Sequence, residues 1–241
     1  MENPMISRLK KMRDPFSIPA VNDTATYSGV AIKEVGLVAI VAASTFATWA
    51  AGYATPVTTM VTAVMGLIVC FAISAKPAWA GTLAPLYAIL EGMFLACISA
   101  MAETMYPGLV MQAVALTFGI AMAAAFVYSR GLVTVNGTFM KAVSVALFGL
   151  IFCYIGQFIL SFFGVDFSFL QGGIVGIGID IAIIGLATAC LFIDYEMINQ
   201  AVSQGLPKSY EWYCAFSLLV TLVWLYIRVL DLLMTISSSR D

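Results

Sequence analysis

Seven long stretches of apolar residues follow one another along the chain, and short polar or turn-forming segments separate them. An apolar run of about 20 residues is long enough to cross a bilayer as an α-helix. The separating segments contain proline, glycine or charged residues, which typically end helices. The pattern therefore predicts an all-α membrane protein with seven transmembrane helices. We place these near Val30–Ala51, Val57–Ser74, Thr82–Met101, Leu109–Tyr128, Lys141–Phe163, Gly173–Ile193 and Trp212–Ile236.

The composition agrees with this prediction. Hydrophobic residues make up 62% of the 241-residue chain and charged residues 10%, whereas about 25% of the residues in a soluble domain are charged. A chain of this length fits one compact bundle, so we expect a basic N-terminal arm at residues 1–29 and a seven-helix transmembrane domain at residues 30–241. The lipid bilayer is the expected partner. The net charge of −2 and the lack of a basic face argue against a nucleic-acid partner.

Lysine and arginine residues gather on alternate connections between the predicted helices. The arm and the start of the first helix carry five of them, and the second, fourth and sixth connections together carry four more. The first, third and fifth connections carry none. Because cytoplasmic loops of membrane proteins are enriched in basic residues, we expect the N-terminus in the cytoplasm and the C-terminus outside.

Five ionisable residues lie within or at the ends of the predicted helices, where hydrocarbon should surround them. A charge near the bilayer centre costs roughly 3–17 kcal/mol, depending on the water or partner that it finds. We therefore take these residues as candidates for an ion pathway and its gate. They are Glu91, Asp180, Asp194, Arg228 and Asp231.

Polar residues on the last two helices fall on faces that can meet. Asp180 and Asp194 lie 14 residues apart, which places them within about 40° of one another around the helix axis. On the last helix a polar stripe recurs at helical spacing, formed by Ser217, Thr221, Trp224, Arg228 and Asp231. Two polar faces that meet in a bundle can form either a buried ion pair or a hydrated path.

Each of the five ionisable residues also has a structural explanation when taken alone. Arg228 and Asp231 are neighbours at positions i and i+3 and could pair with each other. Asp180 could lie near the outer headgroups, Asp194 could mark the cytoplasmic end of its helix, and Glu91 could be a buried carboxyl bonded to a neighbour. Taken together, five ionisable residues are more than the packing of so small a bundle requires.

The residue types that the chain lacks exclude several kinds of chemistry. It has no histidine, so histidine-ligated haem or zinc and Ser-His or Cys-His catalysis are excluded. The five cysteines lie in apolar stretches without a Cys-x-x-Cys pair, which indicates packing rather than disulfides. We therefore predict that the protein is not an enzyme, and we assign it no cofactor and no metal site.

Three segments of the sequence resemble a known family of membrane proteins. The sixth predicted helix runs on into LFIDYEMIN at residues 191–199, which is similar to an acidic signature of that family. The segments GLPKSYEW at 205–212 and VTLVWLY at 220–226 resemble its entry into the seventh helix, and YAILEG at 87–92 resembles its third helix. With these motifs the chain resembles the Bax-inhibitor (transmembrane BAX inhibitor motif) family, in its bacterial branch.

The resemblance implies a bundle with the last helix at its centre, in the bacterial inner membrane. It also implies a pH-sensitive calcium leak that a pair of carboxylates on the sixth and seventh helices controls. Asp194 matches the acid of the sixth helix. At the position of the seventh-helix acid the chain has Arg228, followed three residues later by Asp231, so the two signs are exchanged. An Asp194–Arg228 pair would keep its contact over most of the physiological pH range, because it has no proton to share between two acids.

Helix geometry indicates a different partner for Arg228. Asp194 lies 11 residues before Gly205, about 16 Å along a helix, whereas Arg228 lies 21 residues after Pro207, about 31 Å along the next. A plain antiparallel hairpin puts the two side chains at different depths. Asp180 then competes as the partner of Arg228 and Asp231.

Our leading hypothesis from the sequence is a passive, pH-modulated leak for calcium or another cation. Glu91, Asp180, Asp194 and Asp231 would attract or relay the cation, and Arg228 would act as a closing counter-charge. Oxygen ligands suit calcium, with water or carbonyl groups completing its shell. The alternative is a non-transporting regulator that binds a membrane partner protein, such as a membrane protease, through the basic segment 8–13 of the arm.

Overall fold

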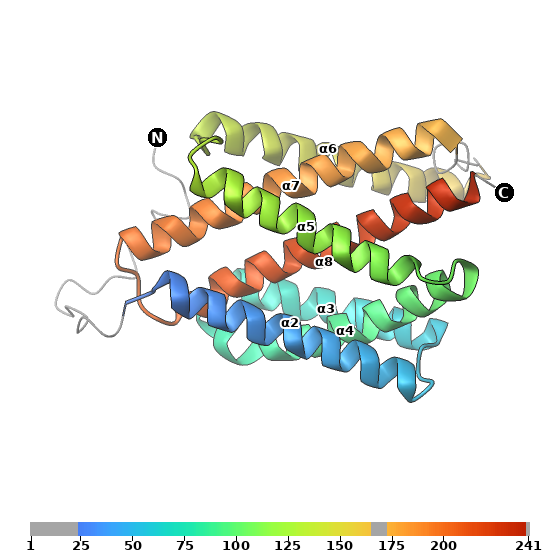
Figure 1. Ribbon diagram of the computed structural model, residues 1–241, viewed down its shortest axis with the longest axis horizontal. Helices are drawn as coiled ribbons and strands as arrows, with labels where there is room; N and C mark the ends of the chain where they lie inside the picture. Colours follow the sequence, from blue (N-terminus) through green and yellow to red (C-terminus); the bar gives the residue numbers. More distant parts are fainter. Residues whose placement is uncertain (1–23, 165–172, 240–241) are drawn as a thin grey trace.

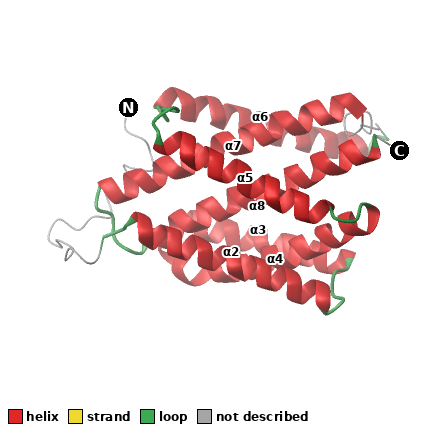
Figure 2. Ribbon diagram, viewed as in Figure 1, coloured by secondary structure: helices red, strands yellow, loops and turns green. Residues whose placement is uncertain are grey.

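Seven long helices form the part of the chain that the computed structural model describes, residues 24–164 and 173–239 (Figures 1 and 2). Each is long and apolar enough to cross a membrane, and this described part contains no β-strand, so the predicted seven-helix membrane fold is confirmed. The basic segment 8–13 of the predicted arm lies outside the described residues. The helices are α2 (Tyr27–Ala50), α3 (Pro56–Ala75), α4 (Ala80–Met105), α5 (Leu109–Ser129), α6 (Gly137–Ser161), α7 (Gly173–Ser203) and α8 (Tyr210–Ser238), with a 3-10 turn, η2 (Pro77–Trp79), before α4.

Polar side chains start several helices by binding free backbone N–H groups, as N-caps do. The side chains of Thr26, Thr55 and Asn136 each accept a hydrogen bond from the backbone N–H three residues further on. Pro56 then occupies the first turn of α3, where its missing N–H costs no helical bond. These caps explain why α2, α3 and α6 begin a few residues before the purely apolar runs.

Helix α7 continues ten residues beyond its predicted end at Ile193. Its 31 residues span about 46 Å, against a hydrocarbon core of about 30 Å. The apolar run stops at Ile193, but the helix ends only before Gly205, whose φ of 61° is a left-handed conformation that favours glycine. Asp194 consequently lies inside a continuous helix that runs on to Ser203.

The last helix, α8, lies between two groups of helices (Figure 1). It packs against α2 and α4 on one side and against α5 and α7 on the other, while α6 packs on α7. Half of the membrane span in α8 is buried, a larger share than in any of the other six described spans. The buried face of α8 therefore determines which polar groups of the other helices find partners.

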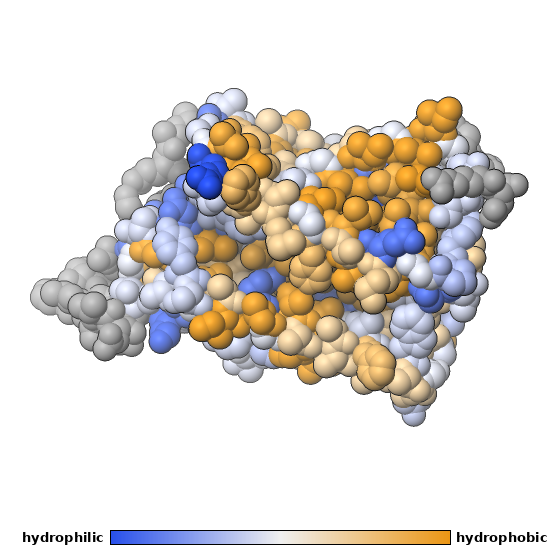
Figure 3. Space-filling view, viewed as in Figure 1, coloured by the Kyte–Doolittle hydropathy of each residue, from blue (hydrophilic) through white to orange (hydrophobic). Residues whose placement is uncertain are grey.

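The outer surface of the bundle is strongly apolar, as Figure 3 shows for one face. In α6, Val143 is the one buried residue, and large side chains such as Phe148, Phe152 and Phe158 are between 63% and 70% exposed. Such continuous apolar surface is typical of a membrane-facing region. The surface and the seven spans together show an integral membrane protein.

A buried carboxylate joins the start of α2 to the start of α8. The Glu211 side chain is fully buried and forms an ion pair with Lys33. It also accepts hydrogen bonds from the backbone N–H of Thr26 at 2.9 Å and from the Thr26 hydroxyl at 3.0 Å. Next to it, the N–H of Ala25 donates to the carbonyl of Leu206 at 2.7 Å. These contacts satisfy a charge that would be costly to bury alone.

Gly29 allows the Glu211 side chain to lie against α2, and its replacement should loosen this contact. A Cβ atom at position 29 would come within 2.1 Å of a Glu211 carboxylate oxygen. We expect Gly29→Ala to lower the free energy of unfolding by about 1–3 kcal/mol, as overpacking does, measured by thermal unfolding of the full chain in detergent. Gly36→Ala is the matched control on the same helix, since nothing lies within 4 Å of its added Cβ. It should be neutral or stabilise by up to about 1 kcal/mol, and equal effects of the two changes would contradict this account.

Candidate functional site

Asp194 is a buried carboxylate held by two hydroxyl groups of α8. The residue is 6% exposed. The Ser217 hydroxyl donates to its Oδ1 at 2.7 Å, and the Thr221 hydroxyl donates to its Oδ2 at 2.6 Å. Ser217 and Thr221 lie one turn apart on the same face of α8. Both oxygens of the acid are thus bound from one neighbouring helix.

Asp194 and Arg228, which the family resemblance would pair, are not in contact. Arg228 forms an ion pair with Asp231, its Nη1 lying 3.2 Å from the Asp231 Oδ2. The structure therefore has no Asp194–Arg228 pair, because the two residues lie at different depths, as helix geometry predicts. In an antiparallel pair of helices, the residues of α8 that face Asp194 are those about as far from the connecting turn, and these are Ser217 and Thr221.

A second polar cluster lies further along the same pair of helices. The Thr235 hydroxyl donates to Asp180 at 3.4 Å, and Asp180 lies within electrostatic range of both Arg228 and Asp231. The Arg228 guanidinium also stacks over the ring of Tyr154 from α6, 5.7 Å from its centroid. The structure thus places Asp180, the competing partner that helix geometry indicates, in the neighbourhood of Arg228.

The two clusters together form what we call the α7–α8 seam. Its residues are Asp180, Asp194, Ser217, Thr221, Arg228, Asp231 and Thr235. The two aspartates of α7 stand 14 residues apart, about 21 Å along the axis. The side chains of Arg228 and Asp231 are 22% and 33% exposed, whereas Asp194 lies in the core.

Glu91 belongs to a different helix interface from the seam. Its Oε1 lies 3.2 Å from the position that a Cβ would take at Gly66 of α3, and its side chain interacts with the hydroxyl of Tyr87 one turn earlier on α4. Glu91 therefore packs between α3 and α4. The structure brings together four of the five predicted residues along one helix pair and leaves the fifth apart.

Glu34 is a buried acid that the sequence reasoning missed. It is 8% exposed, and Asp194 lies within its electrostatic range. A signal was present, because Glu34 shares one helical face with the apolar residues Val30, Leu37 and Val41, all of them buried. Its place beside Lys33 near the start of a span made it resemble part of a solvated helix end.

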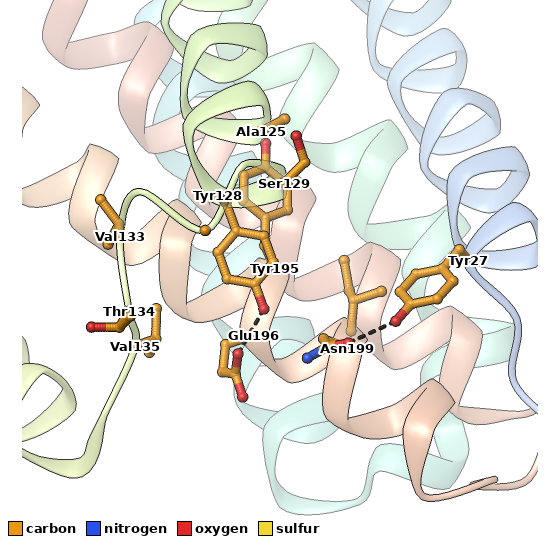
Figure 4. Close-up of a pocket in the computed structure, with 12 residues that line it drawn as sticks. Tyr27, Ala125, Tyr128, Ser129, Val133, Thr134, Val135, Tyr195, Glu196 and Asn199 are labelled. Carbon is orange, nitrogen blue, oxygen red and sulfur yellow. Dashed lines mark hydrogen bonds between the residues drawn. The ribbon is translucent and has the colours of Figure 1, made fainter.

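A cavity of about 700 Å³ opens beside this region, between the end of α5, the loop that follows it and α7 (Figure 4). In the close-up, the Tyr128 hydroxyl donates to Glu196 at 2.6 Å and the Tyr27 hydroxyl donates to Asn199 at 2.7 Å. Tyr195, the neighbour of Asp194 in the chain, also lines the cavity. This hollow, which carries the polar groups of Tyr128, Glu196 and Asn199 among apolar residues, thus reaches the helix turn that carries Asp194.

The acids of this region are spread along the helices rather than clustered. Among the residues that the structure describes, no group of three or more acidic or cysteine side chains is arranged to hold a metal ion. All five cysteines are free. The oxygen atoms that a cation could meet are therefore those of one or two carboxylates, of hydroxyls and of backbone groups.

The hydroxyls that hold Asp194 should contribute measurably to stability. We expect Ser217→Ala and Thr221→Val each to lower the free energy of unfolding by about 1–3 kcal/mol, because each leaves a buried carboxylate oxygen without its donor. Thermal unfolding of the detergent-solubilised protein measures this change. Thr188→Val is the control, since the Thr188 hydroxyl donates to a carbonyl of its own helix. In the Asp194→Asn background the two losses should shrink, and losses of unchanged size there would refute the coupling.

Comparison with known proteins gives a family match that covers nearly the whole chain. The sequence model of a family described as Bax inhibitor 1 like matches residues 3–238. Comparison with curated proteins and with solved structures gave no significant match. The matched segment includes all seven described spans and every residue of the α7–α8 seam. The chain belongs to the Bax inhibitor 1-like family.

Proposed function

We propose that the protein is a passive cation leak in which ions pass along the α7–α8 seam, with calcium as the ion that the family resemblance implies. The observation that carries this proposal is the burial of Asp194 in the core of a membrane bundle, with hydroxyl donors instead of a basic partner. A packing role would be served as well by an apolar residue. An intramembrane acid without a counter-charge is expected on an ion or proton path.

The seam residues have separate roles in this proposal. Asp194 attracts the cation in the core, and Asp180 and Asp231 attract it about 21 Å further along. Arg228 pairs with Asp231 and lies within electrostatic range of Asp180, so its positive charge offsets the attraction of both acids for a cation. Protonation of the acids removes the negative charge that draws a cation in, so lower pH should reduce the flux. Glu91, which packs between α3 and α4, is not part of this path.

The proposed orientation places the N-terminus in the cytoplasm and the C-terminus outside, in a bacterial inner membrane. The cavity beside Glu196 then opens on the cytoplasmic side, since the α5–α6 loop that lines it follows Arg130. Asp180, Arg228 and Asp231 then lie toward the outer side. An ion entering from outside meets the Arg228 cluster first, then Asp194, and leaves through the tyrosine-lined cavity.

Calcium flux in liposomes tests this proposal and the role of Arg228 together. We expect vesicles that contain the protein to take up calcium faster than empty vesicles, and Arg228→Ala to raise the flux severalfold because the blocking charge is removed. Arg228→Lys should stay near the wild-type flux. Lys76→Ala is a control away from the seam and the cavity, since Lys76 stacks on Trp79, and it should leave the flux unchanged.

Two results would count against the proposal. Equal uptake by empty and protein-containing vesicles would reject the leak and favour the alternative, a non-transporting regulator that binds a partner such as a membrane protease. Flux that is the same in Arg228→Ala and wild type would reject Arg228 as the closing charge while leaving the leak in place.

A further inference from the structure

Glu34 has no hydrogen-bond partner among the described residues, although it lies in the core. Both of its carboxylate oxygens are buried and neither has a donor within bonding distance. No other described carboxyl group has this property. Buried polar groups in native proteins are nearly always satisfied, and an unpaired carboxylate is among the costliest groups to bury. A buried Glu34 therefore needs either a proton or a bound cation to offset its charge.

The basic residues near this region already have partners. Lys33, the neighbour of Glu34 in the chain, pairs with Glu211, and Arg228 pairs with Asp231. The other titratable groups that interact with Glu34 or Asp194 are phenols and thiols from α7 and α8. They are Cys190, Tyr195, Tyr213 and Cys214. Within the described chain, Glu34 thus lies within electrostatic range of Asp194, and neither acid forms an ion pair with a basic side chain.

The second acid, Asp194, is fixed in place for such a cation. Its two oxygens each accept one hydroxyl from α8, and a carboxylate oxygen has a second lone pair available. The two hydroxyls therefore orient Asp194 and still leave each of its oxygens a lone pair with which to bind a cation. Glu34 brings two free oxygens from α2, on the helix that the Glu211 contact fixes to α8.

We propose that Glu34 and Asp194 together form a binding site for one small divalent cation between α2, α7 and α8, which calcium would occupy as it passes along the proposed path. The two carboxylates offer oxygen atoms and two negative charges, which suits a hard divalent ion. Two carboxylates supply at most four oxygens, fewer than the six to eight that calcium takes, so water completes the shell. Binding is consequently weak, as conduction requires. This proposal rests on the proposed leak, because it names a binding step on the same path.

Calcium titration by calorimetry, with the full-length protein in detergent, tests the site. We expect Glu34→Gln to weaken calcium binding at least tenfold, and Asp194→Asn to do the same, because each removes one of the two charges. The Gln side chain keeps the size of Glu. Glu103→Gln is the matched control, since Glu103 binds the backbone N–H groups of Gly108 and Val110 at the α4–α5 turn, and it should bind calcium as the wild type does. Circular dichroism checks that each variant is folded.

The outcomes separate this site from the leak. Calcium affinity that is equal in wild type and Glu34→Gln, or no calcium binding by the wild type, overturns the site and leaves a proton as the occupant of Glu34. If the site fails in this way while liposome flux exceeds that of empty vesicles, the leak stands without it. If calcium binding depends on Glu34 but the vesicles show no flux, the site stands and the leak fails.

Discussion

In the apolar interior of a helical bundle, a carboxylate such as Asp194 needs donors that lie at its own depth. Helices α7 and α8 run antiparallel, so the groups of α8 that can reach Asp194 are fixed by their distance from the turn between the helices. Ser217 and Thr221 meet this condition. Arg228 does not, and it pairs with Asp231 near Asp180 instead. This register produces two polar clusters on one helix pair, and the proposed ion path follows from their positions.

The start of α2 is tied to the same helix pair by another buried acid. Glu211 at the beginning of α8 binds Lys33 and Thr26 of the first helix. This contact holds α2 against α8, where Glu34 lies within electrostatic range of Asp194. The ion-paired carboxylate of Glu211 thus holds in place the helix that carries Glu34. Glu34 itself has no hydrogen-bond partner among the described residues. The exterior of α6 and its neighbours is apolar. The polar groups inside the bundle are therefore the groups that could bind or conduct an ion.

The seven spans could be predicted from the sequence because length and hydropathy alone determine which segments fit a bilayer. The proximity of Asp180 to the Arg228 cluster was also predictable, since it follows from residue counts on either side of one turn. The end of α7 was not, because helix geometry continues through the polar residues after Ile193 until Gly205 changes the backbone direction. Glu34 and Glu211 were missed for a related reason. Both lie near the start of an apolar helix, where sequence alone does not distinguish a solvated acid from one that a second helix buries.

Water access along the seam is the most direct test of the central claim that cations pass between α7 and α8. In a chain with the native cysteines replaced, Ser217→Cys would be treated with a positively charged, water-soluble thiol reagent while calcium flux into liposomes is recorded. The same treatment of Ser144→Cys on α6, whose native hydroxyl donates only to its own helix, is the control. We expect modification at position 217 to stop the flux and modification at position 144 to leave it unchanged. Undiminished flux through a fully modified Ser217→Cys protein, or flux through a protein in which the reagent never reaches the thiol introduced at position 217, would contradict the account.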